Sequence, residues 1–272
     1  MFDLGPALVA ELLLLGSVTG FLAGLLGVGG GMLMVPFMTW ILASRGVPPG
    51  LAVKMAIATS MATIVFTSVS SVRAHHGRQA VRWDLVRSMA PGLVLGGLLS
   101  GAGLFAVLRG PWLAAFFALF IGFSAVQMLL DRKPAPTRQM PGALGQFAVG
   151  SGIGLVSGLV GAGGAFLSVP FMTWCNVPIR QAVGTSAALG FPIALSNTVG
   201  YLVAGRDLPA ALPGAKGYLY LPALVVVALA SVTLAPVGAR VAHRTDTAKL
   251  KRLFALLLFG LAAYMFTHAG AR

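Results

Sequence analysis

Residues 24–40 read GLLGVGGGMLMVPFMTW, and residues 158–174 read GLVGAGGAFLSVPFMTW. Over 21 positions around this motif, a shift of 134 residues gives 13 identities, far more than chance produces. An internal repeat of this kind predicts that the chain consists of two copies of one structural unit. We place the copies at residues 1–136 and 137–272, as two transmembrane repeats. The charged, proline-rich segment DRKPAPTRQMPG at 131–142 is their expected linker.

The composition is that of a membrane protein. Hydrophobic residues make up 57% of the chain, charged residues only 9%, and the mean hydropathy is +0.90, whereas soluble domains contain about 25% charged residues. Lysine and arginine number 19 against 6 acidic residues, so the net charge is +13. In a soluble protein this excess would suggest a nucleic-acid partner. Here the basic residues separate apolar runs, which is typical of membrane anchoring, so we expect the lipid bilayer and no nucleic acid as a partner.

Uncharged runs mark the expected membrane spans. Six of eight runs have about the length of one crossing, since a helix needs about 20 residues to span a 30 Å hydrocarbon core. The other two, 12–44 and 139–179, hold 33 and 41 residues, and each contains one glycine cluster. Because glycine costs about 1 kcal/mol of helix propensity relative to alanine, each long run is expected to fold as two arms that meet at the glycines. The six shorter runs are 55–72, 88–108, 110–130, 181–205, 217–239 and 253–271.

The predicted fold is therefore an all-α polytopic membrane protein with two homologous halves. Each half contains a glycine-broken first hydrophobic hairpin and three full transmembrane helices. The arms are expected at 8–26 and 32–44 in the first half, and at 145–160 and 165–176 in the second. Whether the broken segments re-enter on one side or span fully is left open.

The basic residues favour inverted over parallel repeats. If each long run crosses the membrane once, the basic residues divide ten to nine between the two sides; if each run enters and returns, they divide thirteen to six. The positive-inside rule favours the second division, with both termini outside. Paired broken helices in inverted repeats are a recurring transporter design, with the substrate site where the copies meet.

The two breaks predict a site for a small anion. Irregular backbone at membrane depth occurs only where protein or a water-filled cavity satisfies its polar groups. The arms that begin near Met32 and Phe166 would each present unpaired N–H groups and the positive end of a helix dipole, a combination that binds anions. We predict that glycines, two Thr-Ser pairs and one amide bind the substrate: Gly29, Gly30, Gly31, Thr59, Ser60, Gly163, Gly164, Thr185, Ser186 and Asn197. Lys54 and Arg180 are candidates for attracting the anion.

Some of these residues have a second interpretation. Gly20 and Gly24 have the spacing of a helix-packing motif. Thr59 and Ser60 can bond to carbonyls of their own helix, as hydroxyls in membrane helices often do. The glycine clusters at the breaks favour ligand approach, because adjacent helix breakers serve packing poorly.

The residues also indicate which chemistry to exclude. His75 and His76 have no carboxylate or cysteine near them in sequence, so a solvated loop is favoured over a metal site. Glu11 is the one acidic residue inside an apolar run, and Cys175 is the one cysteine. We therefore expect no catalytic residues, no metal and no cofactor, and a transporter or a membrane subunit without transport rather than an enzyme.

The doubled glycine motif followed by Val-Pro, the later Thr-Ser pairs and the stretch HHGRQAVRWDL at 75–85 resemble the sulfite exporter TauE/SafE family of membrane permeases. The resemblance covers nearly the whole chain. It implies a multi-pass carrier in the bacterial cell inner membrane that moves small sulfur-containing anions such as sulfite or organosulfonates, usually outward. A permease for another small organic anion is the alternative. Coupling ion, direction and a homo-oligomeric state are left open.

Overall fold

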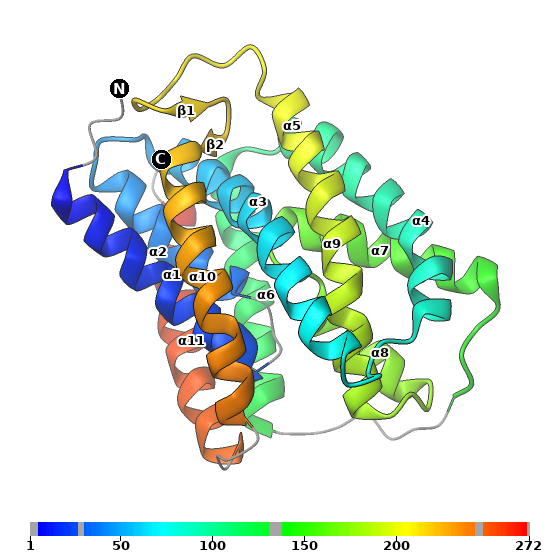
Figure 1. Cartoon of the computed structure of the whole chain (residues 1–272). Coiled ribbons are helices and arrows are strands. Elements are labelled where there is room, and N and C mark those ends of the chain that lie inside the picture. The colour runs from blue at the N-terminus through cyan, green and yellow to red at the C-terminus, as the bar shows by residue number, and fades with distance from the viewer. Residues whose placement is uncertain (1–4, 27–29, 131–137, 243–246, 271–272) are drawn as a thin grey trace.

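The computed structural model describes residues 5–26, 30–130, 138–242 and 247–270. Nearly all of this part is helical (Figure 1). The first half contains α1 (Pro6–Leu26), α2 (Gly31–Ala43), α3 (Pro49–His76), α4 (Trp83–Leu98), the π-helical turn η1 (Leu99–Leu104), α5 (Phe105–Val107) and α6 (Gly110–Leu130). The second half contains α7 (Ala143–Val160), α8 (Ala165–Trp174), α9 (Ile179–Ala204), α10 (Leu221–Ala242) and α11 (Thr247–Gly270). A short antiparallel hairpin, β1 (Ala215–Lys216) and β2 (Leu219–Tyr220), precedes α10 and pairs Ala215 with Tyr220.

Seven helices in the described part are long and apolar enough to cross a membrane, which confirms the predicted all-α polytopic membrane fold. The spans lie at Pro6–Gly24, Pro49–His76, Trp83–Val107, Gly110–Leu130, Ala143–Val160, Ile179–Ala204 and Leu221–Gly238. Shorter apolar helices occur at Gly31–Ala43, Ala165–Trp174 and Arg252–Thr267. The short helices α2 and α8 are the second arms of the two broken segments.

Both long apolar runs are broken at their glycine clusters, within two residues of the expected arm ends. In the second half the break is Gly161–Gly164. Gly161 and Gly164 have φ angles of 70° and 76°, a left-handed conformation that side chains with a Cβ rarely adopt. Glycine is therefore required at these two positions. In the first half Gly29 lies in 27–29, outside the described residues, as does the predicted boundary between residues 136 and 137.

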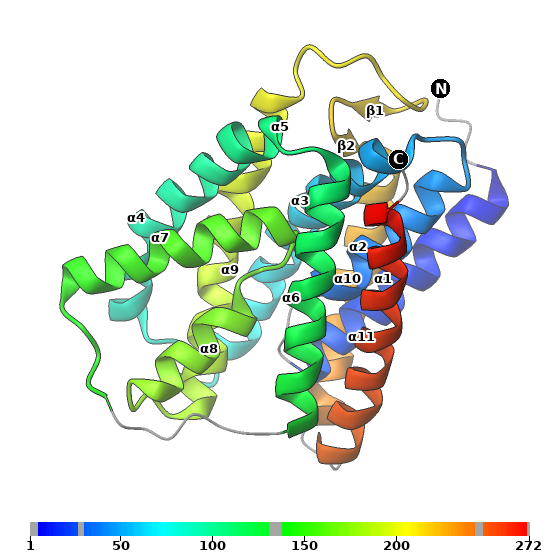
Figure 2. The ribbon, with the colours of Figure 1, turned by 180° about the vertical axis from the view of Figure 1, so that it is seen from behind.

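The two broken pairs point toward opposite ends of the molecule. In Figures 1 and 2, α2 rises to the upper end, where α1 begins and α11 ends, whereas α8 descends to the lower end. Helices α3 and α9 pack against each other at the centre, and α6 packs against α11. Each first arm packs along a helix of the other half, α1 on α10 and α7 on α4.

Glycines make these two long contacts close. A Cβ on Gly16 would lie 2.9 Å from Cα of Val227, and one on Gly20 would lie 2.5 Å from Cα of Ser231. The contact between α7 and α4 has the same form: Gly150 lies against the backbone of Met89, and Gly154 against that of Leu93. Small residues at such positions let membrane helices approach at backbone distance.

Candidate functional site

The two glycine breaks touch each other at the centre of the molecule. Gly31, the first residue of α2, lies on the second break: a Cβ there would be 3.0 Å from Cα of Ala162 and would collide with the carbonyl oxygen of Gly161. The hydroxyl of Ser60, on α3, donates to that carbonyl over 3.0 Å. Helix α3 of the first half therefore holds the break of the second half in place.

A partly enclosed cavity of about 80 Å³ lies beside both breaks and is called the open cavity below. A water molecule needs about 10–15 Å³ measured in this way, so the open cavity has room for several waters or one compact anion. Its walls come from α1, α3, α9 and the lower part of α10, with Gly30 and Gly163 beside the breaks. The lining residues are Gly20, Ala23, Gly24, Gly30, Ile64, Thr67, Ser68, Ser70, Ser71, Ala74, His75, Gly163, Ala165, Val183, Ser186, Ala187, Gly190, Ala235 and Pro236.

Hydroxyl groups of α3 form the polar wall of the open cavity. Thr67, Ser71 and His75 are spaced four residues apart and so share one helix face; Ser68 and Ser70 flank it. These residues were absent from the sequence-based site. The signal that could have found them is the stretch TSVSSVRAHH at 67–76, an unusually dense run of hydroxyls at the end of an apolar segment.

Three of the predicted site residues line the open cavity: Gly30, Gly163 and Ser186. Ser186 is almost fully buried, and its hydroxyl lies 2.7 Å from that of Ser168 on α8. Gly164 caps the start of α8 and lies against the side chain of Ile193. Thus part of the predicted set faces the open cavity, and part of it shapes the breaks around it.

Thr59 and Thr185 lie elsewhere, in two equivalent contacts, of which that of Thr59 is buried and that of Thr185 is partly buried. The Thr59 hydroxyl accepts a hydrogen bond of 3.1 Å from the backbone N–H of Tyr220, directly before α10. The Thr185 hydroxyl accepts one of 2.9 Å from the backbone N–H of Arg82, directly before α4. Each threonine therefore binds the entry of a helix of the opposite half. The Thr59 hydroxyl thus has a partner in the other half, rather than the carbonyl of its own helix that the second interpretation expected.

Asn197 is fully buried between α7, α9 and η1, away from the open cavity. Its amide Nδ2 donates to the carbonyl oxygen of Ile193 over 2.9 Å and lies 3.5 Å from that of Gly154. Lys54 Nζ donates to the carbonyl oxygen of Ala106 over 3.3 Å. Arg180 is exposed at the start of α9. These three predicted residues are thus not brought together at one point.

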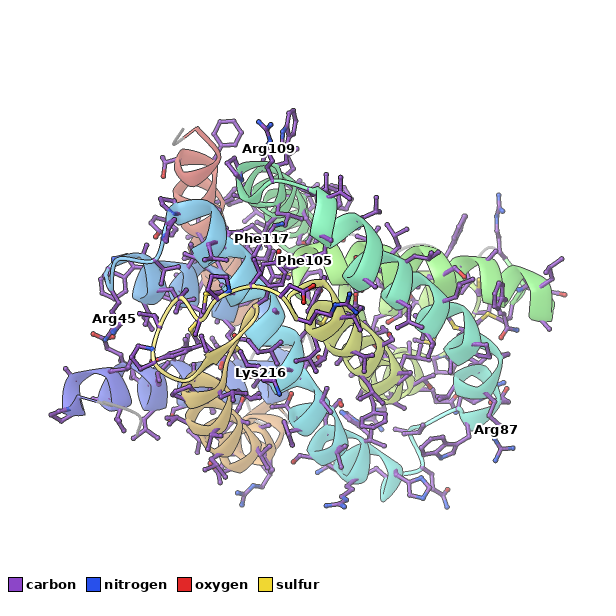
Figure 3. The ribbon with its side chains drawn as sticks, turned by 90° about the horizontal axis from the view of Figure 1, so that it is seen from above. Arg45, Arg87, Phe105, Arg109, Phe117 and Lys216 are labelled. Carbon is purple, nitrogen blue, oxygen red and sulfur yellow. The ribbon has the colours of Figure 1, made fainter. Side chains whose placement is uncertain are left out.

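The open cavity extends toward the lower end of the molecule, where arginines gather. Ala74 and His75 of its wall follow Arg73 at the end of α3. His75 and His76 belong to the last turn of α3, not to a loop as expected, and His76 Nδ1 accepts a hydrogen bond of 3.2 Å from the indole N–H of Trp83. Arg87 lies at the periphery of the molecule in Figure 3, as do Arg45 and Arg109. Basic residues near this end of the described part include Arg73, Arg78, Arg82, Arg87, Arg180 and Arg240.

Comparisons with known proteins agree with the resemblance drawn from the motifs. The model of the family described as Sulfite exporter TauE/SafE matches residues 12–265. A probable membrane transporter protein of Haemophilus influenzae is 34% identical over 255 residues, which cover 93% of this chain and 96% of that relative. A probable membrane transporter protein of Methanocaldococcus jannaschii is 23% identical, with 95% of each chain covered. No solved structure matches the chain.

Proposed function

The chain belongs to the sulfite exporter TauE/SafE family, and on this premise we propose that it exports small sulfur-containing anions, such as sulfite or organosulfonates, across a bacterial cell inner membrane. That it is a multi-pass membrane protein of a transporter family is established by its spans and its relatives. The observation that carries the substrate class is the open cavity at the two breaks. The described residues that line it offer hydroxyls and backbone groups but no carboxylate.

The chemistry of the breaks suits an oxyanion. Helices α2 and α8 begin at Gly31 and Ala165, next to the open cavity. Helix starts carry unpaired N–H groups and a partial positive charge, which attract anions. A glycine at position 30 or 163 lets a ligand reach that backbone. Because the open cavity is small and its described lining contains no Phe, Trp or Tyr, a compact charged head group fits it better than a large apolar substrate.

Within the proposed site, the residues have two kinds of role. The anion would contact Gly30, Gly163 and Ser186. The same role is predicted from the sequence for Gly29, which lies outside the described residues. Ser60, Gly31 and Gly164 would fix the geometry of the breaks, and Thr59 and Thr185 would position the helices around them. Lys54 and Arg180, near opposite ends, would attract the anion to either mouth of the path.

We also propose that the two halves are inverted, with the arginine-rich lower end in the cytoplasm. The opposite directions of α2 and α8 support this arrangement (Figures 1 and 2), as does the excess of basic residues expected on the cytoplasmic side. The open cavity then receives its anion from the cytoplasm, which is the side from which an exporter must load. A homo-oligomeric state is compatible with this arrangement and is not required by it.

The test is anion flux in liposomes that contain the purified protein. We expect radiolabelled sulfite or an organosulfonate to cross faster than in empty liposomes, and sulfate, acetate and chloride to cross more slowly. The panel is measured with and without a pH gradient, which detects coupling to protons. A preference for acetate or another carboxylate would contradict the sulfur-anion assignment and favour a permease for other organic anions.

A glycine substitution tests the position of the site. Gly30→Val should reduce sulfite flux at least tenfold, because Gly30 lines the open cavity and a Cβ there would lie 3.1 Å from Thr19 of α1, so the larger side chain displaces this wall. Gly152→Val is the matched control, because a Cβ on Gly152 meets no atom within 4 Å. If the Gly30→Val protein accumulates normally and transports at the parental rate, the anion does not bind at the breaks.

A further inference from the structure

A second polar cluster lies between α7, α9 and η1, and its polar atoms are not satisfied. Gly158 packs against Asn197 Oδ1 and Ser100 Oγ so closely that a Cβ would collide with both. Asn197 and Ser100 are fully buried, and neither of these two atoms has a hydrogen-bond partner. Ser157 Oγ, on the preceding residue of α7, also lacks one and lies on the side of Gly164, 3.1 Å from a Cβ placed there. We call Ser100, Ser157, Gly158 and Asn197 the closed cluster. Buried polar atoms without partners are rare and costly, so the closed cluster calls for an explanation.

The closed cluster occupies the place in one half that the open cavity occupies in the other. Gly16 and Gly20 meet α10 at Val227 and Ser231, while Gly150 and Gly154 meet α4 at Met89 and Leu93. Positions in α1 and α7 that make the same contact are thus 134 residues apart, and those in α10 and α4 are 138 apart. Thr59 and Thr185, with their matching hydrogen bonds, are 126 apart in α3 and α9.

These offsets equate the walls of the two places residue by residue. Gly24 of the open cavity corresponds to Gly158, and Ser71 corresponds to Asn197. Ala235 corresponds to Gly97. A Cβ placed on Gly97 would lie 2.9 Å from Asn197 Nδ2. One set of walls therefore surrounds a cavity, and the equivalent set is packed shut.

The π-helical turn η1 closes the second set of walls. A Cβ on Gly101 would lie 2.8 Å from the carbonyl oxygen of Asn197, and one on Gly200 would lie 2.7 Å from Cα of Gly101. The equivalent part of α10 is an ordinary α-helix in the described residues. Single π-helical turns inside α-helices are frequent at functional sites. This one packs directly against α9 at the end of α4.

An aromatic group lies on the side of the closed cluster that faces the upper end: the hydroxyl of Tyr201 on α9 donates to the carbonyl oxygen of Gly158, and the Phe105 and Tyr218 rings pack next in this group. The ring of Phe105, directly after η1, lies 4.4 Å from that of Tyr201 and 5.3 Å from that of Tyr218. Lys54 Nζ lies 5.5 Å from the centre of the Phe105 ring. In the view from above, Phe105 lies near the centre of the molecule (Figure 3). These rings lie between the closed cluster and the upper end of the molecule, whereas the open cavity extends toward the lower end.

We propose that the closed cluster is the second half of the transport path, a site for the same small oxyanion that opens at the upper end when η1 and Phe105 separate from α9. In that state the Ser100 and Ser157 hydroxyls donate to the anion, and Asn197 Oδ1 accepts from its water shell or from its protonated form. The unpaired atoms of the closed cluster gain their partners only then. This inference rests on the proposed transport function, and it adds to it the far-side residues and the moving element.

Cysteine accessibility tests the proposal, with Cys175→Ala as background because Cys175 is the natural free thiol. Ser71→Cys reports on the open cavity and Ser100→Cys on the closed cluster. A membrane-impermeant maleimide is applied to vesicles of either orientation. We expect Ser71→Cys to react from the lower end and Ser100→Cys to react from neither. Ser124→Cys, buried in α6, gives the rate for an inaccessible thiol.

Removing the aromatic cover should reverse this pattern. With Phe105→Ala, Ser100→Cys should react from the upper end at least tenfold faster than the buried control, and Ser71→Cys should react more slowly than before. If Phe105→Ala does not accumulate, Tyr218→Ala removes the neighbouring ring and is measured in the same way. A Ser100→Cys thiol that stays at the buried rate, or that reacts from the lower end, overturns the proposal.

This labelling requires no substrate, so it separates the two proposals. If sulfite flux is absent but Ser100→Cys becomes reactive from the upper end, the substrate assignment fails and the two-ended path stands. If sulfite flux is present and Ser100→Cys never reacts in the Phe105→Ala or Tyr218→Ala protein, transport stands and the path through the closed cluster is wrong.

Discussion

The open cavity and the closed cluster have equivalent walls, yet only one of them is packed shut. The difference lies in the helix that faces the central pair. In the closed half, Gly97 and Gly101 allow the backbone of α4 and η1 to rest on α9. In the open half, the residue equivalent to Gly97 is Ala235, which lines a cavity. Since dispersion contacts between backbones drive helix association in membranes, the glycines of α4 and η1 would, in the proposed two-ended path, mark the side that rests closed.

The comparison also gives the repeated motif a role in the proposed path, in which one of the two places is open at a time. Three glycines recur in both copies of the motif, Gly27, Gly29 and Gly30 in the first and Gly161, Gly163 and Gly164 in the second. The residues around the motifs differ, and in the proposed transport path they would set which end is open at rest. Broken helices that meet at the interface of two repeats are suited to the proposed exchange, because one element can move while the breaks stay in place.

The largest effect is expected from a methyl group placed on equivalent glycines of the two halves. Gly158→Ala would push against Asn197 and Ser100, whereas Gly24 faces the open cavity. Overpacking of this kind costs about 1–3 kcal/mol, so Gly158→Ala should disfavour the closed cluster and change sulfite flux about tenfold or more. Gly24→Ala should change flux less than threefold. Equal effects of the two variants on flux and on Ser100→Cys labelling would contradict the claim that one place is closed and the equivalent place is open.

A smaller, unequal effect is expected from the two threonines. Thr59→Val leaves the N–H of the buried Tyr220 without its acceptor, which should lower the unfolding free energy by about 1–3 kcal/mol. Thr185→Val exposes the N–H of Arg82 to partial solvation, because that bond is only part-buried, and should cost about 0.5–1.5 kcal/mol. Thermal unfolding of both variants in detergent gives the two values. A larger loss for Thr185→Val would contradict this order, and Thr59→Ser, which keeps the hydroxyl, should restore most of the stability.

The smallest effect is expected at the outer ends of the two hairpins. Glu11 of α1 pairs with Arg45 after α2 over 2.7 Å, with both side chains partly exposed. The second hairpin is tied differently, by Arg138 stacked 4.5 Å from the ring centre of Trp174. Glu11→Gln should lower stability by about 0.2–1 kcal/mol, and the difference should shrink in high salt. A loss that is larger than this and independent of salt would mean that Glu11 acts in more than this pair.

The sequence alone was sufficient for the class of protein, most of the helices, the places of the two breaks and the family. Each of these depends on local composition: apolar runs match the thickness of a bilayer, and clustered glycines end a helix wherever they stand. From the sequence, a full span was expected at 253–271, where the apolar helix Arg252–Thr267 is shorter, and hairpin arms were expected where Pro6–Gly24 and Ala143–Val160 are long enough to cross a membrane. The same reasoning grouped Gly30, Gly163 and Ser186, and these three residues line one cavity; that they bind an anion stays a prediction. Whether the halves are inverted stays a prediction.

The tertiary structure decided which polar groups face each other across the halves. In the sequence, the two threonines are adjacent hydroxyl neighbours of Ser60 and Ser186, with nothing to distinguish their roles. In the structure, Thr59 and Thr185 bind the backbone before α10 and α4, more than 100 residues away along the chain. The hydroxyl face of Thr67 and Ser71 becomes a candidate binding surface because a cavity separates it from α1 and α10. Helix partners in a membrane are selected by how closely two backbones can approach. That distance depends on both helices at once, so no single segment of the sequence contains it.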